Sequence, residues 1–425
     1  MNTYAQVLTY AIPGFVVLII VEYIASLVLK KEVSNSLDTI SSLSSGMTNT
    51  LKDVLKLAIV IVSYEWMYKH IASFHITSDL TMYVVCFVLV DFASYWSHRW
   101  NHEINVMWNR HIIHHSSEEF NLSCALRQSI SGLIGIYFFL YVPMALVGVE
   151  PVVVSIVAPL HLFAQFWYHT RLIKNMGFLE KIIVTPSHHR VHHAINPEYI
   201  DKNYAAIFII WDKIFGTFKE EDPSIPPVYG VKKPVRTWNP FLINFQHIWQ
   251  LAKDAWLTDS WSDKVKVWFM PTGWRPKDVM TNHPISTIED VYTYEKYMPS
   301  LTKNLKTWSW AQLIINNFLM YCMLINIDRL GPPELALYAT FLAISIFSYT
   351  SLMDKSKLAI YAELVKFFLC LLIFIRYHSW FDLGGTLSLL TYLVPLYVTC
   401  SLALSFYFLI DNTGELRDDK PRLAS

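Results

Sequence analysis

Histidine is the residue type best suited to chemistry in this sequence, because its copies gather in one region. Eleven of the sixteen histidines fall between residues 98 and 193. Three ordered motifs carry most of them: HRWNH at 98–102, RHIIHH at 110–115 and HHRVHH at 188–193. Histidines within a motif recur at i, i+3 or i+4, so each motif presents two or three imidazoles on one face of a helix.

This spacing predicts metal binding. One ion needs several neutral imidazole nitrogens at about 2 Å, and pairs on a rigid helix supply them. The three motifs offer more ligands than one ion can use, so two ions are expected. Imidazole suits zinc, copper or iron, and the affinity order does not choose among them. The expected ligands are His98, His102, His111, His114, His115, His189, His192 and His193.

Two other histidines have open assignments. His161 shares a helix face with Gln165 and His169 in an apolar stretch, and it either joins the site or is a hydrogen-bonded histidine inside the membrane. His188, the neighbour of His189, points off the face that its motif shares. Its part in the site is undecided.

Two carboxylates are candidate catalytic residues. Asp91 lies two turns before His98 on the same helical face, inside an apolar run where an unpaired charge is costly. We expect it to accept a ring N–H from a ligand histidine, with a packing or tyrosine hydrogen bond as the alternative. Glu103 directly follows His102, and it contacts a second metal, a cofactor or solvent.

The composition shows what must position these residues. The 425-residue chain is 53% hydrophobic and only 16% charged, which indicates a membrane protein. Its net charge of zero excludes a nucleic-acid partner, because phosphates demand an excess of Lys and Arg. The five cysteines form no CxxC pair, so neither a disulfide framework nor a cysteine-type zinc site is expected.

The predicted fold is all-α, a multi-pass integral membrane protein with about nine apolar helices. A bilayer core requires about 20 apolar residues in a helix. The qualifying runs are 8–29, 55–73, 79–97, 130–148, 151–169, 309–327, 333–352, 358–376 and 386–409. Prolines interrupt 130–169, which is alternatively a re-entrant hairpin. The first run lacks a cleavage pattern and is interpreted as a retained span.

The runs divide the chain into expected segments. These are N-terminal membrane helices at 1–78, a catalytic core at 79–219, a Pro/Trp-rich cytoplasmic or interfacial segment at 220–308 without clean helical periodicity, a membrane bundle at 309–410 and a polar tail at 411–425. Positive residues after the first run, near 355 and in the tail orient the chain. They predict an outside N-terminus and a histidine site on the cytoplasmic face.

The three motifs, each beside apolar spans, resemble the fatty acid hydroxylase/sterol desaturase superfamily of integral-membrane di-iron enzymes. The resemblance selects iron and places ligands on the eight histidines above. The superfamily often has a further HxxxH element, which here reads Gln165-Phe-Trp-Tyr-His169, with Gln replacing one histidine. It therefore implies that His169 is a ninth ligand.

A narrower resemblance extends from about Asp91 to Phe218. The stretches NLSCALRQS, QFWYHT and TPSHHRVHHAINPEYIDKNYAAIFIIWDKIFGTF are similar to the tetrahydrobiopterin-dependent ether-lipid monooxygenases of that superfamily. This likeness implies a reduced pterin, O₂, and a lipid substrate from the bilayer. The implied reaction cleaves the ether bond of alkylglycerols to a fatty aldehyde and a glycerol derivative. The membrane would be the endoplasmic reticulum in a eukaryote or the inner membrane in a bacterium.

Two other functions stay open. A sterol or fatty-acyl hydroxylase or desaturase of the same superfamily would use the same ligands with another electron donor. A histidine-based metal transporter would bind ions transiently, and its ligands would be distributed along the spans instead of clustering near the span ends.

Overall fold

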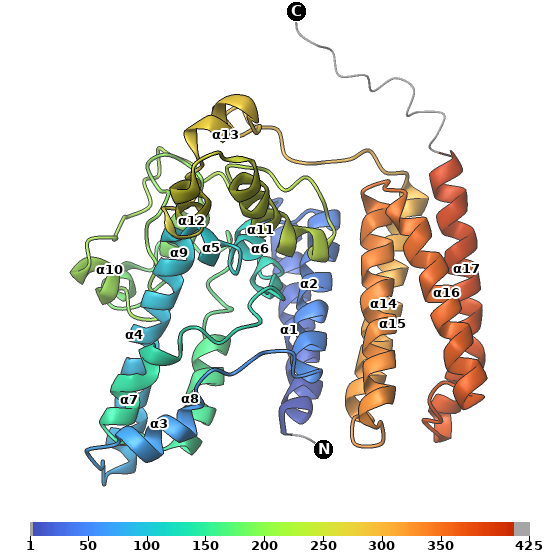
Figure 1. The fold of residues 1–425 in the computed structure, drawn as a ribbon, viewed down its shortest axis with the longest axis horizontal. Helices are drawn as coiled ribbons and strands as arrows, with labels where there is room; N and C mark the ends of the chain where they lie inside the picture. Colours follow the sequence, from blue (N-terminus) through green and yellow to red (C-terminus); the bar gives the residue numbers. More distant parts are fainter. Residues whose placement is uncertain (1–2, 412–425) are drawn as a thin grey trace, which may run out of the picture.

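The protein is helical. The computed structural model describes residues 3–411, and that part of the chain contains α-helices, short 3₁₀ helices and isolated β-bridges but no strand. The predicted polar tail therefore lies outside the described residues, apart from its first residue. Figure 1 shows a histidine-bearing half and a bundle of C-terminal helices, with α1 (Thr3–Val28) and α2 (Ser36–Val54) between them.

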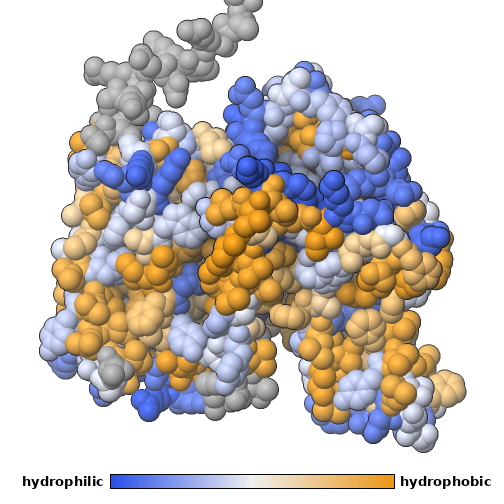
Figure 2. All heavy atoms as spheres, turned by 180° about the vertical axis from the view of Figure 1, so that it is seen from behind, coloured by the Kyte–Doolittle hydropathy of each residue, from blue (hydrophilic) through white to orange (hydrophobic). Residues whose placement is uncertain are grey.

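Among the described residues, five helices are long and apolar enough to cross a membrane. They are α1, α4 (Asp79–Glu103), α15 (Pro332–Met353), α16 (Leu358–Tyr377) and α17 (Leu390–Asp411). Figure 2 shows hydrophobic residues gathered over the middle and lower part of one face, with hydrophilic residues above them. The chain is a multi-pass membrane protein.

The prediction of about nine spanning helices is not confirmed for the described residues. Runs 55–73, 130–148 and 151–169 form only the short helices α3 (Tyr64–Ile71), η2 (Phe138–Tyr141), α7 (Val142–Leu146) and α8 (Pro151–Phe163). Lys56 adopts a positive φ of 51° and a new helix starts only at the Ser63 cap, so run 55–73 is broken. The 13 residues of α8 reach only about 20 Å. Run 309–327 lies in α14 (Lys303–Ile325), which is not among the five.

Residues 220–308 are more regular than the sequence suggested. They contain the 18-residue helix α11 (Pro240–Leu257), followed by α12 (Trp261–Phe269) and α13 (Lys277–Asn282). Asn239 explains where α11 starts, because its side chain caps the helix by accepting from the backbone N–H groups of Phe241 and Leu242. Figure 1 shows α11 and α12 lying over the upper end of α4.

Helix α2 is a polar helix in the interior. Its buried residues include many serines and threonines, and Asn35 caps its first turn. Asp38 in that turn forms a buried ion pair with Arg127, with 2.7 Å between Oδ1 and Nη2. Arg127 also donates to the hydroxyls of Ser42 and Ser116. A buried charge needs such partners, so α2 and the segment after the second histidine motif are locked together.

The C-terminal bundle of α14 to α17 holds a second buried ion pair. Lys366 Nζ lies 2.7 Å from Glu363 Oε1 one turn earlier in α16, and neither side chain is exposed. Ser401 of α17 and Ser348 of α15 donate hydrogen bonds to the same carboxylate. The pair therefore links three helices.

Lys366→Met is expected to destabilise the bundle by about 3–5 kcal/mol, because it leaves the Glu363 carboxylate buried without its counter-charge. The double variant Lys366→Met/Glu363→Gln removes both charges and should recover most of this loss. Thermal unfolding in detergent measures both effects. If the double variant were as unstable as the single one, the charge argument would be wrong.

Candidate metal centre

Four segments bring the histidine motifs together. The last turns of α4 carry His98 and His102, and the short helices α5 (Asn105–Trp108) and α6 (Ile112–His115) follow directly. Helix α9 (Pro186–His193) begins after Thr185 with proline in its first turn, as the sequence predicted. Figure 1 shows α5, α6 and α9 at the upper end of α4. The remaining short elements are η1 (Cys124–Leu126), η3 (Gly177–Lys181), α10 (Ile210–Ile214) and η4 (Gly385–Leu389).

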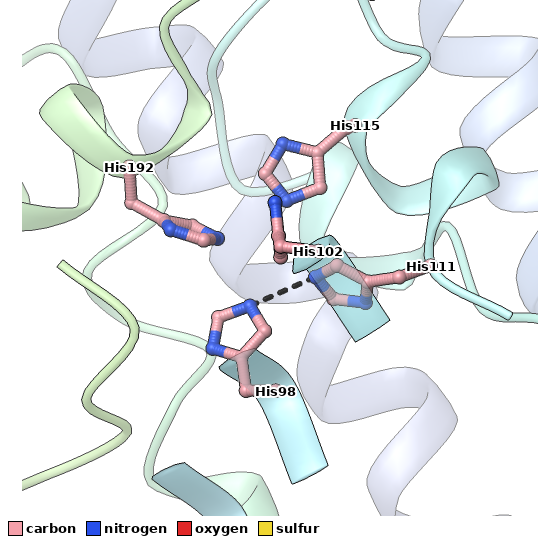
Figure 3. A group of neighbouring side chains, drawn as sticks. All are labelled: His98, His102, His111, His115 and His192. Atoms are coloured by element: carbon pink, nitrogen blue, oxygen red, sulfur yellow. Dashed lines mark hydrogen bonds between the residues drawn. The ribbon is translucent and has the colours of Figure 1, made fainter. Parts of the chain in front are cut away.

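Five of the predicted ligands form one group, hereafter the five-histidine group. Each offers one ring nitrogen, and these nitrogens all lie within 4.8 Å of one another. Figure 3 shows the rings pointing toward a common centre from separate segments, and it marks the contact of 2.9 Å between the Nε2 atoms of His98 and His111. The members are His98, His102, His111, His115 and His192.

The other four form the four-histidine group, which meets the same 4.8 Å criterion: His114, His169, His189 and His193. His169 Nε2 lies 2.8 Å from His189 Nε2 and 3.3 Å from His114 Nε2. The two groups adjoin, because the ring of His115 stacks on that of His193 with 4.2 Å between their centroids. The structure thus brings together all nine histidines that the sequence analysis selected.

Backbone carbonyls orient several rings. The carbonyl oxygens of Tyr204, Gln165 and Lys202 lie 2.7 to 3.0 Å from the Nδ1 atoms of His98, His169 and His192, in that order. A carbonyl can only accept, so Nδ1 carries the proton in each and the Nε2 lone pair is free. Each of these Nε2 atoms faces its group, which is the arrangement that metal-ligating histidines commonly have.

The donor set fits a metal cofactor. Within the five-histidine group, the Nε2 atoms of His102, His115 and His192 are buried without a hydrogen-bond partner. Three unpaired nitrogens at one place are costly unless something binds them. Burial, reinforced by neighbouring imidazoles, holds the pKa of His111, His115 and His192 well below its usual range. These rings are therefore neutral at physiological pH, the form that binds a metal.

The structure places Asp91 differently from the expectation. Its carboxylate accepts from the backbone N–H groups of Ile207 and Phe208 and from the indole N–H of Trp211, at 2.8 to 3.0 Å. The imidazole that it holds is His161, 2.7 Å away, which belongs to neither group. Asp91 thus fixes the segment after Tyr204 and does not reach a predicted ligand directly.

The remaining candidates lie beside the groups. Glu103 pairs with Arg99 at 2.9 Å and keeps 40% of its side chain exposed. His188 faces the start of its own helix, where its Nδ1 accepts from the backbone N–H of Thr185 at 3.4 Å. Gln165 lies outside the two groups, although its carbonyl holds His169.

Sequence reasoning missed the segment 201–204. Asp201 lies with Oδ1 3.8 Å from His102 Nδ1, while the carbonyls of Lys202 and Tyr204 hold His192 and His98. Asp201 and Asn203 both have positive φ values, 58° and 54°, a conformation that Asp and Asn adopt more readily than most residues. The sequence DKNY after the third motif was the available signal for such a turn.

The fold and the centre together define a membrane oxidoreductase with a histidine-rich metal site, and the comparisons agree. Residues 83–217 match the fatty acid hydroxylase family model. The chain is 34% identical to alkylglycerol monooxygenase of Homo sapiens over 370 residues, which are 87% of this chain and 82% of that one. The corresponding protein of Xenopus tropicalis is 34% identical over 84% of this chain and 79% of its own.

The chain belongs to the alkylglycerol monooxygenase family, and it is a monooxygenase. A shorter match, 29% identical over 136 residues, covers 32% of this chain and 41% of the ornithine lipid hydroxylase of Rhizobium tropici. No solved structure matches the chain.

Proposed function

We propose that this protein is an O₂-dependent di-iron monooxygenase that cleaves the ether bond of alkylglycerols to a fatty aldehyde and a glycerol derivative. The observation that carries the proposal is the convergence of nine histidines in two adjoining groups. These groups lie within the segment that matches the fatty acid hydroxylase model, in a chain related over most of its length to alkylglycerol monooxygenases.

Each group would hold one iron ion through ring nitrogens, the five-histidine group with room to leave one nitrogen uncoordinated. Iron bound there would activate O₂ and hydroxylate the alkyl carbon next to the ether oxygen, with tetrahydrobiopterin as two-electron donor. The hydroxylated carbon is a hemiacetal, which breaks down to the aldehyde and the glycerol derivative.

The residues of this chain position the ligands and exclude water. The carbonyls of Tyr204, Gln165 and Lys202 fix ring orientation. The buried ring of Phe120 covers the four-histidine group, with centroids 5.2 Å from His193 and 5.8 Å from His169. An apolar wall of this kind keeps the site dry.

Two further parts of the proposal concern Glu103 and the surroundings of the protein. Glu103 is half-exposed beside the five-histidine group, and we propose that it contacts a cofactor there. The positive residues of the sequence support a cytoplasmic site. The membrane is then the endoplasmic reticulum of a eukaryote or the inner membrane of a bacterium.

Purified protein loaded with ferrous iron, given 1-O-alkylglycerol, tetrahydrobiopterin and O₂, should release fatty aldehyde, about one per O₂ consumed. Aldehyde trapping and oxygen uptake measure this. Oxidation of a sterol or a fatty-acyl lipid instead, without aldehyde from alkylglycerol, would favour the hydroxylase or desaturase alternative. No lipid oxidation, with metal flux in liposomes, would favour the transporter.

A further inference from the structure

Glu22 is the one charged residue in the membrane-spanning stretch Val7–Val28 of α1. Its side chain is buried although the rest of the helix is strongly apolar. Oε1 accepts the hydroxyl hydrogen of Thr170 at 2.6 Å, and Oε2 accepts the backbone N–H of Leu122 at 2.7 Å. A carboxylate at such a position is costly and indicates a function.

Glu22 lines a cavity of about 1160 Å³, large enough for a lipid head group and the start of its chain. The cavity lies between α1, the first turn of α2, the segment 119–123 and α14. Its lining is polar at Thr39, Asn121 and Ser123 and apolar at Ile19 and Trp310. This mixture suits an amphiphilic ligand.

The cavity adjoins the four-histidine group. Glu119 and Asn121, which line it, flank Phe120, whose ring packs against His169 and His193. Thr170, the partner of Glu22, directly follows His169. The same two short segments thus form the wall of the cavity and one side of the histidine group.

The cavity also lies at the level of lipid head groups. Lys30 and Lys31, which directly follow α1, line it and are exposed. Lysines at the end of a span mark the membrane interface. Glu22 lies six residues before Val28, which is about 9 Å deeper along the helix. An alkyl lipid in the bilayer can present its head group at this depth.

We propose that this cavity binds the glycerol head group of the substrate, with the Glu22 carboxylate accepting hydrogen bonds from its two hydroxyls. The assignment rests on the proposed function. Ether cleavage oxidises the carbon bonded to the ether oxygen, and the head group beyond it is only three carbons with bonds of about 1.5 Å. The head group must therefore bind beside the metal-bearing groups. An ionised carboxylate offers about four acceptor positions, of which Glu22 uses two in the protein.

Glu22→Gln tests the assignment. Binding of radiolabelled 1-O-alkylglycerol to the purified protein without O₂ should weaken about tenfold or more, because a hydrogen bond to a charged group is lost. The KM should rise by a similar factor while kcat changes less than about threefold. An analogue with both hydroxyls methylated should bind wild type and variant equally weakly. Glu32→Gln, an exposed carboxylate of the same cavity, is the matched control and should bind alkylglycerol normally.

The outcomes separate this proposal from the function itself. Normal alkylglycerol binding by Glu22→Gln, in a protein whose wild type cleaves the ether, would overturn the head-group site alone. Equal losses for alkylglycerol and for the methylated analogue would reduce Glu22 to a structural link. Absence of ether cleavage by the wild type would overturn the proposed function. If Glu22→Gln does not fold, Ser34→Trp narrows the cavity from a half-buried position and should weaken binding about tenfold or more; unchanged binding would reject the site.

Discussion

His114→Ala should lower the rate of lipid oxidation by more than about a hundredfold, which is the upper end of the loss seen when only an outer partner of a metal ligand is removed. His114 presents Nε2 to His169 at 3.3 Å within the four-histidine group. Its removal leaves three nitrogens for the second ion. Iron content should therefore fall from about two ions per chain toward one, as measured by metal analysis and Mössbauer spectroscopy of anaerobically purified protein.

His75→Ala is the matched control, because His75 is exposed in the loop before α4 and lies in neither histidine group. It should keep both activity and iron content. Both variants should be recovered as folded protein in similar yield. A fully active His114→Ala variant would remove this residue from the ligands, and zinc without lipid oxidation in the wild type would count against the di-iron proposal.

The gathering of the histidines could be predicted from the sequence, but their division between two groups could not. Spacing of i, i+3 and i+4 shows which rings share a helical face. His114 and His115 are adjacent, about 100° apart around a helix, and they join different groups. Which ring turns to which group depends on how α4, α6 and α9 are arranged, and this arrangement is set by contacts distant in sequence.

Helix α2 was missed because hydropathy detects only apolar runs. Its interior position depends on partners such as Arg127, which lies 89 residues from Asp38. The omission also weakens one orientation argument. The 19 residues of α2 extend about 28 Å, so Lys52 near its end need not lie at the same membrane face as Lys31 before its start.

The opposite error concerns the number of spans. Apolar composition predicted crossings at 55–73 and 130–148, yet these residues pair with each other outside regular helices. The backbone N–H of Ile59 donates to the carbonyl of Leu133, and the N–H of Gly135 donates to the carbonyl of Ile59. Hydrophobicity alone cannot distinguish a residue facing lipid from one packed against another part of the chain.

Asp91 shows the same limit within the site. The helical period placed it correctly on the face of His98, but its partners Ile207, Phe208 and Trp211 follow more than 110 residues later. The geometry gives it a positioning role. It holds the segment whose Tyr204 carbonyl orients His98, and this role makes a strong prediction.

Asp91→Ala should destabilise the protein by about 5 kcal/mol or more. Four donors share this fully buried carboxylate: two backbone N–H groups, the indole of Trp211 and the ring of His161. Each would be left buried without an acceptor, at a cost of about 1–3 kcal/mol. Asp79→Ala, an exposed aspartate in the first turn of the same helix, is the matched control and should cost less than about 1 kcal/mol. The midpoint of thermal unfolding in detergent compares the two.

Asp91→Asn separates the positioning role from a direct link to a ligand. It keeps one acceptor oxygen and the side-chain volume, so more folded protein should be recovered than for Asp91→Ala. Because His161 lies outside both groups, the folded fraction should retain about two iron ions per chain. Loss of iron from folded Asp91→Asn protein would show that the carboxylate supports a metal ligand more directly than its hydrogen bonds indicate, and normal stability of Asp91→Ala would contradict the network as a whole.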